Sequence, residues 1–332
     1  MQSREIRLKS YPEGLPTPDD FELATVELPD PADGEVLVRN HYMSVDPYMR
    51  GRMRDSKSYA PPFALGAPLN GHSVGEVVTS TDPDFKPGDA VAGFGGWRDH
   101  CIASGADLVR VDPTLAPLQT YLGTLGMPGM TAYVGLLDIG RPEKGQTVFV
   151  SAASGAVGSI VGQIAKIRGC RVVGSAGSDE KIAWLEGEAG FDAAFNYKRA
   201  DHLNAELTRH CPAGIDVYFD NVGGAHLEAA ITHMNHHGRI ALCGMIGQYN
   251  ATQPAPGPNN LMLAVGKRLA LQGFIVSDHQ ERREAFFADM GAWIGAKKIK
   301  WRETVVQGLE NAPGAFIGLF HGENFGKMIV EL

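Results

Sequence analysis

Thr147-Val-Phe-Val-Ser-Ala-Ala-Ser-Gly-Ala-Val-Gly-Ser159 reads as an apolar strand that breaks into a glycine-rich turn and opens a helix. The turn, Ala153-x-Gly155-x-x-Gly158, is the dinucleotide-binding pattern with alanine in place of its first glycine. Glycine lets a pyrophosphate approach the N–H groups at a helix N-terminus, where the helix dipole favours negative charge. A helix from Ala156 to Arg168 and a strand at Arg171–Ser175 complete a βαβ unit of roughly 30 residues. The alternative is an ordinary tight strand–helix turn.

Strands and helices alternate from Thr147 onward. Helices are expected at Asp179–Gly187 and Ala225–Met234, and such alternation predicts a doubly wound parallel sheet of the Rossmann type. The Pro/Gly-rich stretch Gln253–Asn260 cannot be regular structure, and it is either a lid or a plain surface loop. Strands are expected at 147–152, 171–175, 193–196, 216–220, 239–243 and 269–275.

The first third of the chain has a different pattern. Short β segments such as Glu35–Arg39 and Val74–Ser80 are separated by turns, which indicates a β-rich domain. Helical spacing over Leu118–Leu137 bridges to the second domain, and the tail from Trp301 returns to the first. We therefore expect a first domain at 1–126, completed by 297–332, and a cofactor domain at 127–296.

Composition and charge limit the partners. The formal net charge of −8 argues against nucleic acid and anionic membranes, and no apolar stretch is long enough to span a bilayer. Met1–Ser10 carries charges and lacks the apolar core of a signal peptide, so a cytoplasmic location is expected. The four cysteines are widely spaced and suit neither a disulfide framework nor a structural zinc site.

The cofactor preference depends on the end of the second strand. NAD-binding proteins place an acidic side chain there, whereas this strand runs into Ser175-Ala-Gly-Ser178. Lys181 follows on the first turn of the next helix, where its ammonium could meet a 2′-phosphate. Asp179 and Glu180 keep NAD open, although both also suit the first turn of a solvated helix. NADPH is the expected cofactor.

The sequence offers no convincing metal site. His72 stands without the cysteine or histidine partners that catalytic zinc requires. His233, His236 and His237 have helical spacing, but they precede Gly238, and imidazoles favour a helix C-terminus. We expect these three to cap a helix.

Hydride transfer without a metal needs an activated acceptor and a group that stabilises the resulting anion. An alkene conjugated to a carbonyl is such an acceptor, because the negative charge collects on an enolate oxygen. A tyrosine hydroxyl can donate a hydrogen bond to that oxygen. Tyr249 is the first candidate and Tyr48 the second, with simple packing as the alternative for each.

The chain resembles the zinc-independent medium-chain dehydrogenase/reductases, in the branch of alkenal, prostaglandin and curcumin reductases. The resemblance covers nearly the whole chain. It rests on Val45-Asp-Pro-Tyr-Met-Arg50, Gly126-Met-Pro-Gly-Met-Thr-Ala-Tyr133, Ala152-Ala-Ser-Gly-Ala-Val-Gly-Ser159, Ala176-Gly-Ser-Asp-Glu-Lys181, Phe219-Asp-Asn-Val-Gly-Gly224 and Gly322-Glu-Asn-Phe-Gly-Lys327.

This resemblance implies a GroES-like first domain, a homodimer and a set of cofactor contacts. Lys181 and Tyr197 would hold the 2′-phosphate end, and Tyr249 would stabilise the enolate. The pyrophosphate would lie on Gly155, Ala156, Val157, Gly158 and Ser159. The remaining implied contacts are Met127, Thr131, Asn221, Cys243, Gly244, Met245, Ile246, Gly247, Gln248, Phe274, Ile275, Val276 and Asn324.

The expected activity is therefore the NADPH-dependent reduction of the C=C bond of α,β-unsaturated aldehydes or ketones, with curcumin-type enones among the candidates. Two alternatives stay open. One is an NADPH:quinone oxidoreductase on the same fold, because quinones are also conjugated acceptors. The other is a protein that binds NADPH without turnover.

Overall fold

A computed structural model describes all residues, Met1–Leu332, and the chain folds as two compact units. The first unit consists of Met1–Gly123 with Glu303–Leu332, and the second of Thr124–Arg302. Residues 124–126 and 297–302 thus belong to the second unit and not, as expected, to the first. Each unit has its own sheet and its own core.

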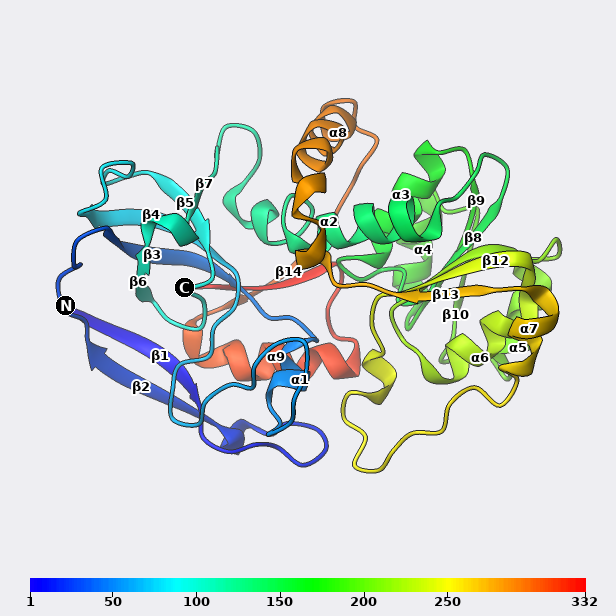
Figure 1. Ribbon diagram of the computed structural model, residues 1–332, viewed down its shortest axis with the longest axis horizontal. Helices are drawn as coiled ribbons and strands as arrows, with labels where there is room; N and C mark the ends of the chain where they lie inside the picture. The colour runs from blue at the N-terminus through cyan, green and yellow to red at the C-terminus, as the bar shows by residue number, and fades with distance from the viewer. The chain divides into compact units, whose positions relative to one another are not determined.

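The second unit is built on a six-stranded parallel sheet (Figure 1). Parallel order places the carboxyl ends of all strands at one edge, where open α/β sheets bind ligands. Its strand order is β10-β9-β8-β11-β12-β13, with bounds β8 Thr147–Val150, β9 Arg171–Ala176, β10 Ala193–Asn196, β11 Ile215–Asp220, β12 Met234–Leu242 and β13 Ala270–Gly273.

Helices cover both faces of this sheet, as a doubly wound fold requires. One face buries Phe149, Tyr218 and Ile240 against Leu207, Leu227 and Ile231 of α5 and α6. In Figure 1, α3 lies on the other side of the strands. The helices of this unit are α2 Met127–Val134, α3 Gly158–Ile167, α4 Asp179–Gly187, α5 Leu203–His210, α6 Gly224–His233, α7 Met262–Lys267 and α8 Arg283–Gly295, with a π-helix at Gly135–Gly140.

The first unit is β-rich and includes the C-terminal segment. Strand β15 pairs antiparallel with β3, so the tail completes the main sheet, ordered β14-β15-β3-β4-β5-β7 with β6 beside β3. A separate hairpin pairs β1 with β2. The bounds are β1 Gln2–Leu8, β2 Phe21–Glu27, β3 Glu35–Ser44, α1 Met49–Arg52, β4 Ser73–Ser80, β5 Ala90–Gly93, β6 His100–Ser104, β7 Val109–Arg110, β14 Glu303–Gln307, α9 Ala312–His321 and β15 Lys327–Glu331.

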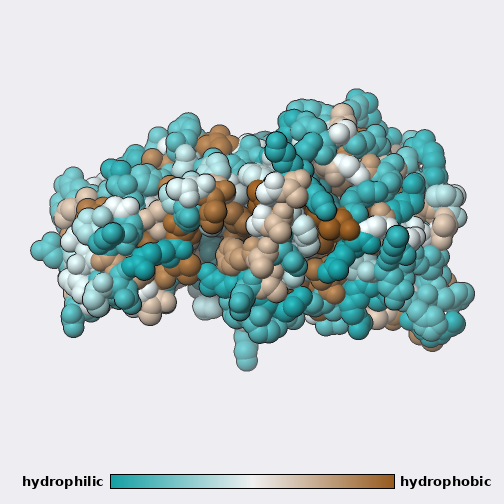
Figure 2. Space-filling view, turned by 90° about the horizontal axis from the view of Figure 1, so that it is seen from above, coloured by the Kyte–Doolittle hydropathy of each residue, from teal (hydrophilic) through white to brown (hydrophobic).

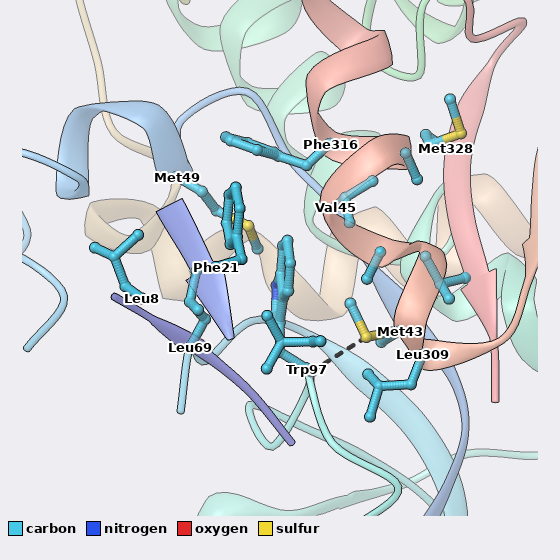
Figure 3. Close-up of a cluster of buried hydrophobic side chains, with 14 of the residues drawn as sticks. Leu8, Phe21, Met43, Val45, Met49, Leu69, Trp97, Leu309, Phe316 and Met328 are labelled. Atoms are coloured by element: carbon cyan, nitrogen blue, oxygen red, sulfur yellow. Dashed lines mark hydrogen bonds between the residues drawn. The ribbon is translucent and has the colours of Figure 1, made fainter. Parts of the chain in front are cut away.

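Aromatic side chains pack among leucine, methionine and valine side chains in the core of the first unit (Figure 3). The Trp97 ring is stacked with Phe21 at a centroid distance of 6.1 Å, and Phe316 of α9 meets Trp97 edge-on. The Trp97 amide donates to the Met43 sulfur at 3.2 Å. Aromatic rings packed in this way stabilise the fold by more than their buried area alone would give. This core supports the segment that follows β3.

The histidine cluster differs from its expected role. Helix α6 ends at His233, but His236 and His237 belong to strand β12. The capping interpretation is therefore wrong for those two, because the pairing of β12 with β11 begins already at Met234, opposite Ile215. The stretch 253–260 has no regular structure, in agreement with its proline content.

No helix is both long and apolar enough to cross a membrane. The face in Figure 2 is mostly hydrophilic with scattered apolar patches.

Candidate functional site

The glycine-rich turn connects β8 to α3 and leaves no room for a side chain at Gly158. A Cβ on Gly158 would lie 2.5 Å from the Ala152 carbonyl oxygen. Ala152 itself has a positive φ of 47°, which is uncommon for a residue other than glycine. Helix α3 starts at Gly158, while residues 155–157 keep some exposure. The turn therefore fits a pyrophosphate in both shape and polarity.

Two lysines and a tyrosine gather beyond β9 and β10. A Cβ on Gly177 would lie 3.3 Å from the Tyr197 hydroxyl oxygen and 3.2 Å from Cε of Lys198. Burial lowers the pKa of Lys181, and the nearby ammonium of Lys198 lowers it further. The edge of the Tyr197 ring packs on His226 at 5.2 Å. A dianionic phosphate would relieve the repulsion between the two ammonium groups, so this corner fits a 2′-phosphate.

Asp179, which kept NAD open in the sequence, has other partners. Its carboxylate accepts a hydrogen bond from Asn196 Nδ2 at 2.7 Å and forms an ion pair with Arg199. Ser178 caps α4 by accepting from the Lys181 amide at 3.4 Å. Asp179 thus serves the start of α4 and its neighbours, which weakens the case for a carboxylate that binds a ribose.

The loop after β12 contains most of the remaining expected contacts. The Met245 amide donates to the Tyr249 hydroxyl oxygen at 3.3 Å, and a Cβ on Gly244 would lie 3.0 Å from that oxygen. The Tyr249 phenol therefore turns back over its own loop. Asn221, at the end of β11, donates from Nδ2 to the Ser151 carbonyl oxygen at 2.7 Å.

Residues expected near the nicotinamide meet at α2 and the end of β13. The Phe274 ring lies against Gly135, where a Cβ would come within 2.4 Å of Cζ, and contacts Phe219 edge-on. The Thr131 hydroxyl donates to the Met127 carbonyl oxygen at 2.8 Å, within α2. The close packing at Gly135 joins the segment Phe274–Val276 to the helix that carries Met127 and Thr131.

In the first unit, Tyr48 follows a buried ion pair. Lys327 Nζ lies 3.2 Å from Asp46 Oδ1 and donates to the Val45 and Met328 carbonyl oxygens. Ser44 donates to the other Asp46 oxygen. Burial, and then the charge of Asp46, raise the pKa of Tyr48 well above its ordinary value. The Tyr48 phenol therefore keeps its proton throughout the neutral range.

His72 and Asn324 also belong to the first unit. His72 Nδ1 is buried without a hydrogen-bond partner, and burial lowers the pKa of the ring. Asn324 donates to the Gly326 carbonyl oxygen at 2.9 Å. Nowhere in the structure do three His, Cys, Asp or Glu side chains gather so that they could hold a metal ion.

Sequence reasoning missed two residues of the second unit. Lys198 follows Tyr197 directly, and the pairing of Asn196 with Ala176 brings the ends of β10 and β9 together. The sequence signal for Lys198 is its place directly after Tyr197, a residue already assigned to the phosphate. Asp220 lies inside the quoted stretch Phe219–Gly224, but only the fold reveals what converges on it.

Comparisons with known proteins identify the family. A family model described as the N-terminal domain of oxidoreductase matches residues 4–111, and one described as zinc-binding dehydrogenase matches residues 156–290. Prostaglandin reductase 1 of Bos taurus is 50% identical over 100% of this chain and 99% of its own length. The chain is a medium-chain dehydrogenase/reductase. It belongs to the zinc-independent branch that contains the prostaglandin, curcumin and 2-alkenal reductases.

Other members of this reductase branch support the assignment. The NADPH-dependent curcumin reductase of Escherichia coli is 46% identical over 100% of this chain and 97% of its own length. The crystal structure of CurA from Vibrio vulnificus in complex with NADPH superposes with a TM-score of 0.94 at 46% identity, covering 99% of this chain and 98% of that one. The expected Rossmann domain and β-rich domain are therefore confirmed as the fold of this reductase.

Proposed function

We propose that this protein uses NADPH to reduce the C=C bond of α,β-unsaturated aldehydes and ketones. Relatives named curcumin reductase, 2-alkenal reductase and (+)-pulegone reductase are 42–46% identical over the full chain. 2-Alkenals, curcumin and pulegone all have an alkene conjugated to a carbonyl. The observation that carries the proposal is this shared acceptor chemistry, together with a corner where Lys181, Lys198 and Tyr197 suit the phosphate of NADPH.

One set of residues would bind the cofactor, and another would stabilise the enolate that forms from the acceptor. The turn Gly155–Ser159 would hold the pyrophosphate, and Lys181, Tyr197 and Lys198 the 2′-phosphate. When bound, NADPH supplies the hydride that the β-carbon of the acceptor receives. The Tyr249 and Tyr48 hydroxyls are the candidates to donate a hydrogen bond to the enolate oxygen, and the α-carbon then takes a proton.

Product analysis tests the reaction. Purified protein is incubated with NADPH and short 2-alkenals, long-chain enones, diarylheptanoid enones or quinones, and the products are identified by mass spectrometry. Saturated carbonyl products are expected. NADPH oxidation with quinones while every enone stays unreduced would favour the quinone oxidoreductase alternative, and no oxidation with any acceptor would favour a binding protein. A Tyr249→Phe variant as active as the wild type would remove the role given to that hydroxyl.

A second measurement tests the cofactor preference. Lys181→Ala should weaken NADPH binding about 10- to 100-fold, because a charge-assisted contact with the phosphate is lost, and should leave NADH binding nearly unchanged. Titration of cofactor fluorescence gives both constants. Equal losses for the two cofactors would contradict the assignment of Lys181 to the 2′-phosphate. A Lys198→Ala variant, measured in the same way, tests the neighbouring ammonium.

We also infer a homodimer in the cytoplasm. Met262 and Val265 of α7 are 82% and 79% exposed, and β13 pairs on one side only, with β12. An unpaired edge strand beside an apolar helix is a surface that a second copy could cover. Four cysteines without a disulfide suit a reducing compartment. Sedimentation analysis of wild-type protein and Met262→Asp should give dimer and monomer; a monomeric wild type would refute the dimer.

A further inference from the structure

Asp220 is fully buried at the carboxyl end of β11, and four hydrogen bonds converge on its Oδ1 atom. The donors are the Tyr218 hydroxyl at 2.6 Å, the Gly223 amide at 2.9 Å, the Val222 amide at 3.0 Å and the Ser151 hydroxyl at 3.3 Å. Burial raises the Asp220 pKa, and these donors oppose that rise. The side chain of one aspartate thus fixes the turn between β11 and α6.

The main chain of Asp220 fixes a second loop. Its carbonyl oxygen accepts from the amides of Cys243 at 2.9 Å and Gly244 at 3.1 Å. The next carbonyl oxygens continue this contact, because Asn221 accepts from the Ile246 amide and Val222 from the Gly247 amide. The loop after β12 is therefore held along the loop after β11.

A third segment joins through Ser151, which follows β8. Its hydroxyl oxygen accepts from the Asn221 amide at 3.0 Å, and its carbonyl oxygen accepts from Asn221 Nδ2 at 2.7 Å. Ser151 directly precedes Ala152 and the glycine-rich turn. Three loops at the carboxyl edge of the sheet, each with residues assigned to NADPH, thus meet at the Asp220–Ser151 pair.

We propose that Asp220 is a positioning residue for NADPH, which acts through Asn221 and the loop Cys243–Gly247. This rests on the proposed cofactor of the reductase. The network uses peptide and hydroxyl donors that would otherwise turn toward water or cofactor, so it sets the orientation of these loops before NADPH binds. Asp220 itself is too deeply buried to be a contact: its exposed fraction is 0%.

The test is Asp220→Asn, which keeps the size of the side chain and an oxygen for the four donors. It removes the negative charge and puts an NH2 group in place of Oδ2, which is buried without a hydrogen-bond partner. We expect the Kd for NADPH, measured by fluorescence without any acceptor, to rise about 10- to 100-fold. In the protein without NADPH, hydrogen exchange should quicken in residues 221–224 and 243–247. At saturating NADPH the kcat should change much less than the KM for NADPH.

Asp216→Asn is the matched control. Asp216 lies on the same strand at its other end, where it accepts from the Thr147 amide and from Asn235 Nδ2, each at 2.8 Å. This variant should lose stability without a change in NADPH affinity. Where Asp220→Asn does not fold, Tyr218→Phe keeps the carboxylate, removes one donor and should still raise the Kd several-fold.

Wild-type affinity in Asp220→Asn, or in Tyr218→Phe where that variant replaces it, would overturn the proposal. So would an equal loss of affinity in Asp216→Asn, because the effect would then belong to general stability. The binding test involves no acceptor. A wild type that binds NADPH but reduces no enone would refute the proposed reaction and leave this inference standing.

Discussion

Asp46 in the first unit and Asp220 in the second are both buried, but their charges are balanced in different ways. Asp46 faces a single cation, the Lys327 ammonium, which also donates to two carbonyl oxygens. Asp220 faces no cation in its hydrogen-bond shell and accepts from two amides and two hydroxyls. One carboxylate is balanced by a single cation with one hydroxyl beside it, and the other by several dipoles.

This difference changes what a mutation can do. Removal of the only cation leaves a buried charge without an opposite charge, which is among the most costly changes in a protein interior. Removal of one donor among four leaves three in place, so the cost is that of one hydrogen bond. The first unit therefore depends more on a single side chain than the second does.

The largest effect is expected for Lys327→Met. The side chains of Lys327 and Asp46 are 5% and 6% exposed, so the carboxylate left without its cation should lower the free energy of unfolding by about 3–5 kcal/mol. Urea denaturation measures the loss. The double variant Asp46→Asn with Lys327→Met should regain most of it, because both charges are gone. A single variant as stable as the wild type would break the comparison between the two aspartates.

The second-largest effect is expected in acid, which should destabilise the second unit before the first. Burial lowers the pKa of His226 in the second unit to about 4. Between pH 6.5 and 4, His226 is therefore protonated in the unfolded chain but stays neutral in the folded unit. The free energy of unfolding is at its full value above pH 6.5 and falls as the pH drops toward 4, by about 3 kcal/mol from this residue.

Hydrogen exchange at pH 7 and pH 4.5 can show where in the chain this loss of stability begins. The helix α6 that carries His226 should lose protection in acid, and His226→Phe should flatten the dependence of its protection on pH. His72 of the first unit is also held neutral by burial, but the charge of Asp46 opposes the lowering of its pKa. Acid opening that starts in the first unit would contradict this order.

The smallest effect is expected for an exposed ion pair. Arg199 and Asp179 are 75% and 56% exposed, so Arg199→Ala should change the free energy of unfolding by about 0.5 kcal/mol or less. Thermal unfolding measures it at low and high salt. A loss comparable with that of Lys327→Met would mean that burial is not what makes the Asp46 pair important.

Local signals were enough to predict much of the second unit. The helix at Asp179–Gly187 and the strand at Ala193–Asn196 have the expected bounds, because Ser178 is a strong helix cap and the strand is a short apolar run. The strand β12 begins five residues earlier than the predicted strand at 239, since pairing with β11 overrides the polar sequence around His236 and His237. Sequence patterns cannot see such pairing.

The sequence indicates candidate site residues one segment at a time. The turn Gly155–Ser159 lies in a single stretch and was recognised from its glycines. Asp220 gains its role from Ser151 and the loop after β12, which come together only when three strand ends meet. The Tyr249 hydroxyl likewise turns toward Met245, an orientation that spacing does not encode.

The cysteines, three of them buried and Cys243 half-buried, have a consequence for a protein that handles conjugated carbonyls. Such compounds alkylate thiolates by Michael addition, and a thiol is inert while it stays protonated. Burial raises the pKa of Cys101 and Cys170, and that of Cys211 and Cys243 to about 12. The chain thus offers almost no thiolate at neutral pH, and it should survive prolonged contact with electrophiles that inactivate less protected enzymes.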